Sequence, residues 1–175
     1  FGAVRLVLKL LPSMRERRSG HIINVSSIGA QANAPRFAAY VASKAALDAF
    51  GRCLSSEVRS DGIDVTTVYM PLVRTPMIRP TTMYRYFPAW TPEHGGDAIV
   101  RSMINRPKSV TTMLGRAAAV SYAVWPRMND VVLNRGFRLF PTSTAARGSA
   151  DAPAEPEKPT LEQVVFATLF RGEHW

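Results

Sequence analysis

The residue types best suited to chemistry lie within one stretch of the chain, NVSSIGAQANAPRFAAYVASKAAL, residues 24–47. Ser27 precedes Tyr40, and Lys44 follows Tyr40 at the i,i+4 spacing of a helix. A phenol is a weak acid at neutral pH, but a nearby ammonium group stabilises the phenolate. Such a tyrosine can give a proton to a carbonyl oxygen while a hydride reaches the carbonyl carbon. A serine hydroxyl can hold the same oxygen by a hydrogen bond.

The segments around these residues predict a parallel sheet. Residues 21–27 (HIINVSS) form an apolar, β-branched run of strand length, and residues 63–71 (IDVTTVYMP) form a second one. Residues 38–60 between them have the three- and four-residue spacing of a helix. The order strand, helix, strand predicts two parallel strands buried on both faces, and therefore an α/β fold.

This arrangement predicts that the candidate residues converge. Ser27 lies at the carboxyl end of the first strand, and Thr75 lies just past the end of the second. Both ends of parallel strands emerge on one edge of the sheet, where ligands bind in open α/β folds. Tyr40 and Lys44 share one face of a helix that begins beside that edge. Ser26 is expected to bond to the backbone, and Asn24 to be a core polar residue.

The pattern Ser-x12-Tyr-x3-Lys resembles the short-chain dehydrogenase/reductase family, with G-x-I-x-N-V-S-S before it and A-S-K-A-A-L after it. The resemblance covers about residues 1–105. It implies a Rossmann-like, doubly wound parallel sheet and a nicotinamide cofactor. It also assigns Tyr40 as the acid-base residue, Lys44 to the nicotinamide ribose and to Tyr40, and Ser27 to the substrate oxygen.

The segment PLVRTP, after the second strand, matches the family's carboxamide-binding loop in part. Pro71, Val73 and Thr75 align on that loop and are candidate cofactor contacts, together with Tyr40 and Lys44. Leu72 stands where the family often has glycine.

The family's Gly-rich dinucleotide loop, its Asn-Ala-Gly segment and the asparagine of its catalytic tetrad are not in this sequence. We therefore expect the chain to be the later part of a longer protein and to be inactive alone. The residues that choose between NAD and NADP are not in it either, and we favour NADP.

A looser resemblance, over residues 71–140, is to reductases of long-chain fatty acyl-CoA and related lipid carbonyls. It implies reduction of a fatty acyl-CoA or fatty aldehyde. The alternatives are a reductase of a steroid or β-keto lipid, or a catalytically inactive lipid- or membrane-associated module on the same fold. An apolar lid over an alkyl chain is expected from Met77, Ile78, Met83, Tyr84, Tyr86, Phe87 and Trp90. The interleaved Arg74, Arg79 and Arg85 could meet a carboxylate or a CoA phosphate.

The chain divides into four predicted parts. Residues 1–115 form the later part of a dinucleotide-binding oxidoreductase domain, and residues 116–141 form a helical extension broken at Pro126. A flexible linker over 142–160 and a last helix over 161–175 follow. The extension has three open interpretations: a membrane-surface helix, a cover for the substrate pocket, or a contact with a partner subunit.

Composition limits the partners. The chain has 22 Lys and Arg against 13 Asp and Glu, a formal net charge of +9, but most of its arginines are scattered singly. Nucleic acid would require them in one groove with stacking aromatics, so we expect acidic ligands or anionic lipid instead. The histidines are too dispersed to propose a metal. The one cysteine, Cys53, cannot form an internal disulfide, so we expect a reducing, cytoplasmic compartment, with membrane association left open. We also expect a homo-oligomer.

Overall fold

The computed structural model describes residues 2–78, 84, 87–139, 160–162 and 165. Within them, three parallel strands form a sheet in the order β1 (Gly20–Ser27), β2 (Ile63–Met70) and β3 (Ser109–Val110). β1 pairs with β2 over its whole length, from Gly20 opposite Ile63 to Ser27 opposite Met70. The predicted α/β fold with a parallel sheet is confirmed.

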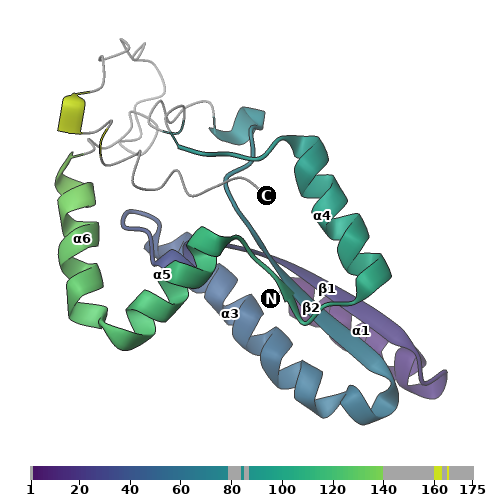
Figure 1. Ribbon diagram of the computed structural model, residues 1–175. Coiled ribbons are helices and arrows are strands. Elements are labelled where there is room, and N and C mark those ends of the chain that lie inside the picture. The colour runs from purple at the N-terminus through teal and green to yellow at the C-terminus, as the bar shows by residue number, and fades with distance from the viewer. Residues whose placement is uncertain (1, 79–83, 85–86, 140–159, 163–164, 166–175) are drawn as a thin grey trace.

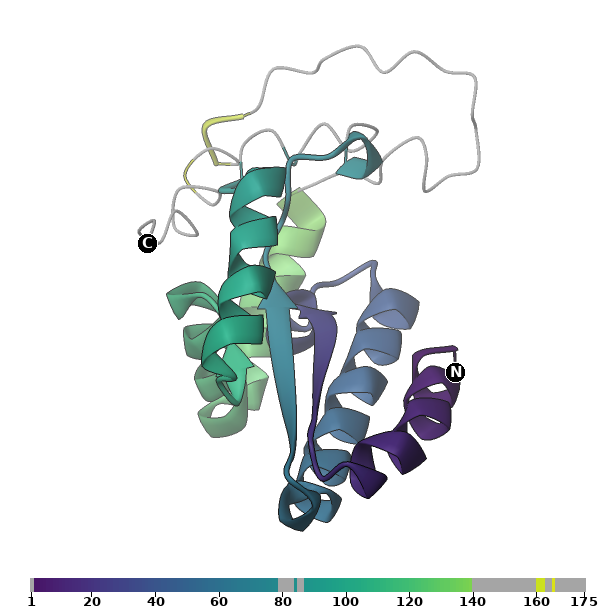
Figure 2. The ribbon, with the colours of Figure 1, turned by 90° about the vertical axis from the view of Figure 1, so that its right-hand side faces the viewer.

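Helices cover both faces of this sheet. α1 (Gly2–Glu16) and α3 (Ala38–Glu57) lie on one face, and α4 (Pro92–Asn105) lies on the other (Figures 1 and 2). The β1–α3–β2 unit is the one that the apolar spacing predicted. Short 3-10 turns, Arg59–Asp61 and Pro76–Ile78, flank β2.

The core lies between the sheet and the layer of α1 and α3. Its members are the buried apolar side chains of Val7, Leu11, Ile22, Leu54, Val58, Ile63 and Val65. Branched side chains dominate it, because they pack well on a pleated surface and against close helices. This packing fixes the position of α3, the helix that carries Tyr40 and Lys44.

α1 continues through Pro12, which lies inside the helix. Proline removes one backbone hydrogen bond to the carbonyl four residues earlier, and Leu8 at that position is exposed, so water can satisfy its carbonyl. β1 is not buried on both sides throughout: it forms an edge of the described sheet, and the Val25 side chain is 38% exposed.

Two further helices follow β3. α5 (Met113–Val124) begins where the Thr112 side chain accepts a hydrogen bond from the Gly115 N–H at 3.1 Å. α6 (Pro126–Leu139) begins at the proline that was expected to divide this segment. α5 packs on the short α2 (Gly29–Ala32), and α6 continues away from the sheet (Figure 1).

The predicted linker and terminal helix lie almost entirely outside the described residues. Of the helices that are described, none is both long enough and apolar enough to cross a bilayer. The described part of the chain also contains no group of three or more His, Cys, Asp or Glu side chains that could hold a metal ion.

Candidate active site

Ser27 is the last residue of β1, and its side chain is held by the turn that follows. The Gly29 N–H donates a hydrogen bond to Ser27 Oγ at 3.0 Å. Because Oγ accepts this bond, its own proton can still be donated to another oxygen. The neighbouring Ser26 is buried and donates to the Lys44 carbonyl at 3.3 Å. Ser26 therefore bonds to the backbone, as expected, and ties β1 to α3.

Tyr40 and Lys44 lie on the first turns of α3, one helical turn apart. The Lys44 ammonium donates to the Val25 carbonyl of β1 at 3.0 Å. Its Nζ also lies 5.9 Å from the centroid of the Tyr40 ring. The lysine charge is thus positioned between the strand and the phenol, while Tyr40 remains 45% exposed and accessible to a ligand.

Gly29 shows how closely the serine and the tyrosine approach each other. A Cβ atom placed on Gly29 would lie 3.3 Å from Ser27 Oγ and 3.7 Å from Cε1 of Tyr40. The two side chains therefore flank the same small residue. The structure brings Ser27, Tyr40 and Lys44 together at the carboxyl edge of β1; their catalytic roles remain a prediction.

A polar pair further along α3 anchors this helix to β2. The Tyr69 hydroxyl donates to the carboxylate of Asp48, which also meets Arg52 with an N–O distance of 3.3 Å. Burial raises the pKa of Tyr69, and the hydrogen bond and charge of Asp48 raise it further, so the phenol stays protonated. Sequence reasoning missed Asp48, although its i,i+4 spacing from Lys44 marks it as a neighbour on the same helix face.

The candidate cofactor loop extends from the end of β2. Val73 forms a parallel bridge with Trp90, and two hydrogen bonds flank it: Arg74 N–H to the Trp90 carbonyl at 2.9 Å and Trp90 N–H to the Leu72 carbonyl at 2.8 Å. These contacts hold Pro71, Val73 and Thr75 at the same edge of the sheet as Ser27. No described contact assigns them to a ligand.

Part of the predicted apolar lid is described. The rings of Tyr84 and Phe37 stack with centroids 6.3 Å apart, and Phe37 immediately precedes α3. Burial raises the pKa of Tyr84, and the nearby Tyr40 phenol raises it further. Tyr84 therefore lies close to Tyr40. Met77 is largely exposed, whereas Met83, Tyr86, Arg79 and Arg85 lie outside the described residues.

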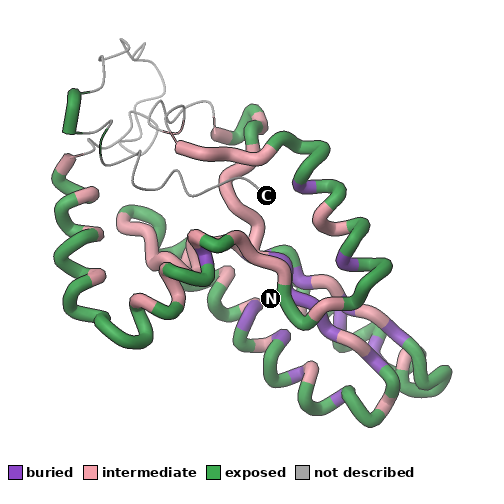
Figure 3. The backbone as a smooth tube through the Cα atoms, in the orientation of Figure 1, coloured by how far each residue is buried: buried purple, intermediate pink, exposed green. Residues whose placement is uncertain are grey.

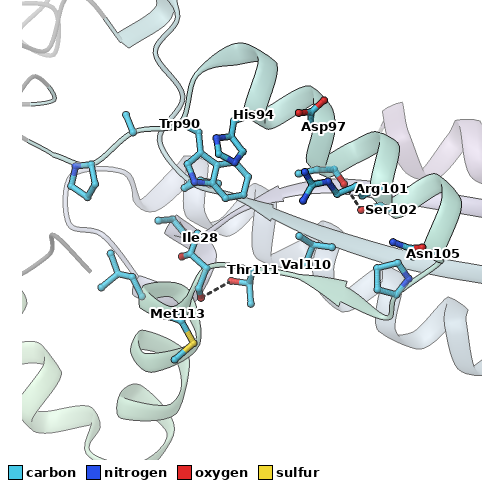
Figure 4. Close-up of a pocket in the computed structure, with 17 residues that line it drawn as sticks. Ile28, Trp90, His94, Asp97, Arg101, Ser102, Asn105, Val110, Thr111 and Met113 are labelled. Carbon is cyan, nitrogen blue, oxygen red and sulfur yellow. Dashed lines mark hydrogen bonds between the residues drawn. The ribbon is translucent and has the colours of Figure 1, made fainter. Parts of the chain in front are cut away.

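A cavity of about 390 Å³ opens between α4, β3 and the start of α5 (Figure 4). Trp90 and His94 stack along its wall, with ring centroids 5.4 Å apart. Ile28 and Pro71 also line it, so the cavity adjoins the strand ends that carry Ser27 and the candidate cofactor loop. Sequence analysis did not predict this cavity, because its walls come from segments far apart in the chain.

Comparison with known proteins agrees with this architecture. Residues 1–84 match the family model described as short chain dehydrogenase. The whole chain is 57% identical to a fatty acyl-CoA reductase of Acinetobacter baylyi, of which it covers 57%. A fatty acyl-CoA reductase of Mycobacterium tuberculosis is 38% identical over 136 residues, which are 77% of this chain and 46% of that protein.

A solved short-chain dehydrogenase from Streptomyces avermitilis has the same fold, with a TM-score of 0.61 and 27% identity. The match covers 79% of this chain and 59% of that one. The chain thus spans about half the length of the curated relatives that it matches. From the sheet, the Ser-Tyr-Lys geometry and these matches, the chain belongs to the short-chain dehydrogenase family.

Proposed function

We propose that the full-length protein is an NAD(P)-dependent oxidoreductase that reduces a long-chain lipid carbonyl, either a fatty acyl-CoA or a fatty aldehyde. The observation that carries this proposal is the placement of Ser27, Tyr40 and Lys44 around one strand end. The printed name of the Acinetobacter baylyi relative supports the substrate class. The aromatic pair of Phe37 and Tyr84 beside Tyr40 offers apolar surface for an alkyl chain.

The donors at the strand edge fit the nicotinamide end of a dinucleotide. An ammonium group has three N–H donors, and the contact with the Val25 carbonyl uses one of those of Lys44. The other two can reach ribose hydroxyls. Pro71, Val73 and Thr75 would border the nicotinamide carboxamide. We propose NADPH rather than NADH as the reductant.

A reduced nicotinamide, when bound, supplies the hydride. Tyr40 donates the proton to the carbonyl oxygen, and Lys44 stabilises the phenolate that remains. Ser27 donates a hydrogen bond to the same oxygen and so holds the carbonyl in line. With a thioester substrate, the resulting hemithioacetal releases the CoA thiol and leaves an aldehyde.

Replacement of one hydroxyl tests the proposal. We expect Tyr40→Phe in the full-length protein to lower kcat/KM for a long-chain acyl-CoA or aldehyde by about 10²–10⁴-fold, because the proton donor is lost. The matched control, Tyr122→Phe, removes an exposed phenol from α5 and should leave turnover unchanged. The measurement is the loss of nicotinamide absorbance with NADPH and, separately, NADH.

Several results would contradict the proposal. Turnover by Tyr40→Phe equal to that of the parent protein would remove Tyr40 from the mechanism. A steroid or β-keto lipid turned over in preference to long-chain acyl substrates would reject the substrate class. We also propose that the 175 residues alone are inactive, which the same absorbance assay tests. We further propose that the enzyme is cytoplasmic and a homo-oligomer, and its mass in solution tests the oligomeric state.

A further inference from the structure

We propose that the outer face of α5 and α6 binds an anionic lipid surface. The binding is argued from the helices themselves. Only its purpose, the transfer of a lipid substrate between a bilayer and the site, rests on the proposed function. Both helices are exposed over most of their length, as Figure 3 shows for the two at the left. The inference concerns which side chains make up this outer face.

The apolar part of the face is continuous along α5. Four exposed residues repeat at spacings of four, three and four, which places them on one stripe of a helix: Met113, Ala117, Val120 and Val124. Trp125 follows between the helices and is 65% exposed. On α6, the exposed large apolar residues are Met128, Val131, Val132 and Phe137, and the ring of Phe137 lies against Arg36. Interfacial helices present such apolar and aromatic side chains to the region between headgroups and acyl chains.

The charged part of the face is basic. The exposed arginines of the two helices are Arg116, Arg127, Arg135 and Arg138, and Asp130 is the only acidic residue between 113 and 139. At 100° per residue, Arg127, Arg135 and Arg138 fall on the same half of α6 as Met128 and Val131. Within the described residues, no ion pair joins these arginines to a carboxylate.

This mixture of charge and apolar surface selects the occupant. A second copy of the chain across a two-fold axis would bring this basic face against an identical basic face, and like charges oppose such a contact. A bilayer with anionic headgroups offers phosphates to the arginines and acyl chains to the apolar stripe. The chemistry of the face therefore favours anionic lipid over a self-complementary interface.

The face is connected to the active site through α5. A Cβ on Gly115 of α5 would lie 3.1 Å from the Ile28 side chain, and Ile28 directly follows Ser27. Thr111, just before the helix, is hydrogen-bonded to Gln31 at 2.7 Å. Met113 begins the stripe and also lines the cavity of Figure 4. Lipid bound along the stripe would thus lie beside the opening of the site.

Co-sedimentation of the full-length protein with vesicles tests this proposal. We expect binding to vesicles of phosphatidylglycerol and phosphatidylcholine, weaker binding at high salt, and little binding to phosphatidylcholine alone. Arg127→Gln/Arg135→Gln should weaken binding about thirtyfold. The matched control, Arg5→Gln/Lys9→Gln, removes the same charge from exposed positions of α1 and should change binding less than twofold.

The apolar part is tested separately. Met128→Asn/Val131→Asn should also weaken vesicle binding, and brominated acyl chains should quench the fluorescence of the parent protein more than that of Trp125→Phe.

Three results would overturn the proposal: equal binding to both vesicle types, equal losses of binding in the arginine variant of α6 and its α1 control, or self-association without vesicle binding. Tyr40→Phe should keep full vesicle binding, so failure here is distinguishable from failure of the catalytic proposal.

Discussion

The position of Lys44 depends on the strand rather than on an acidic partner. Its ammonium is held at 3.0 Å by the Val25 carbonyl, a neutral acceptor, and no carboxylate pairs with it among the described residues. A neutral acceptor fixes the side chain without cancelling its charge. The full positive charge therefore remains available to the Tyr40 ring nearby. A carboxylate in the place of that carbonyl would weaken the effect on which the chemistry depends.

At the same scale, Gly51 sets how closely α3 approaches the sheet. A Cβ there would lie 2.5 Å from Nδ2 of Asn24, a buried amide nitrogen without a hydrogen-bond partner in the described structure. We expect Gly51→Ala to lower the free energy of unfolding by about 1–3 kcal/mol, because overpacking forces the helix or the amide to move. Urea unfolding measures the change.

The partner residue supplies the control for this prediction. Asn24→Ala removes the amide that the new methyl group would meet, so Gly51→Ala should cost much less in that background. An equal cost in both backgrounds would show that the loss comes from somewhere other than the contact with Asn24.

At the scale of elements, His21 makes the sheet's stability depend on pH. Burial lowers the pKa of His21, and Arg106 lowers it further, against the opposing charge of Asp64. As the pH falls through the ordinary histidine value of 6.5, the unfolded chain therefore takes up a proton before the folded chain does. We expect the free energy of unfolding to fall between about pH 7.5 and about pH 5.5. Urea unfolding of His21→Gln should show a shallower dependence, and an unchanged slope would exclude His21 as its source.

The elements differ in how far local sequence determines them. Thr91 and Pro92 are neighbours in the sequence and mark the start of α4, where the Thr91 side chain accepts from the His94 N–H at 3.2 Å, as an N-cap does. β1, β2 and α3 were predictable for the same reason, because the spacing of apolar residues and the residues that cap a helix can be seen within a short stretch of sequence. The two-residue β3 and the pairing of Asp48 with Tyr69 were not, because both depend on segments that meet only in the folded chain.

The same distinction applies to the candidate site. The spacing of Ser27, Tyr40 and Lys44 was visible in one stretch, and their common strand edge followed from the β1–α3–β2 order. The contact of Tyr84 with Phe37 and the cavity beside Trp90 involve loops and helices far apart in sequence. Tertiary packing alone brings these together, so no periodicity could have predicted them.

For the whole molecule, the C-terminal helices are joined to the loop between the candidate catalytic residues. The Arg36 guanidinium donates to the Phe137 carbonyl at 2.8 Å and lies 4.2 Å from the centroid of the Phe137 ring. Arg36 has a φ of 72°, a conformation that favours glycine, so the loop holds this arginine at some cost in backbone energy. Together with the bond between Thr111 and Gln31, this contact fixes α5 and α6 against the site.

Arg36→Gly removes the side chain that holds α6, and glycine adopts the positive φ at this position without the cost in backbone energy. An exposed cation–π contact contributes about 0.5–1 kcal/mol, so amide hydrogen exchange over 126–139 should become roughly two- to fivefold faster. Arg106→Gly is the matched control, because Arg106 also has a positive φ, of 46°, and forms an exposed contact, with Asp64, away from α6. It should leave that exchange unchanged. If both variants or neither accelerate exchange in α6, the Arg36 contact does not hold the helix. The extension is then positioned by the contacts of α5 with α2 and by the bond between Thr111 and Gln31.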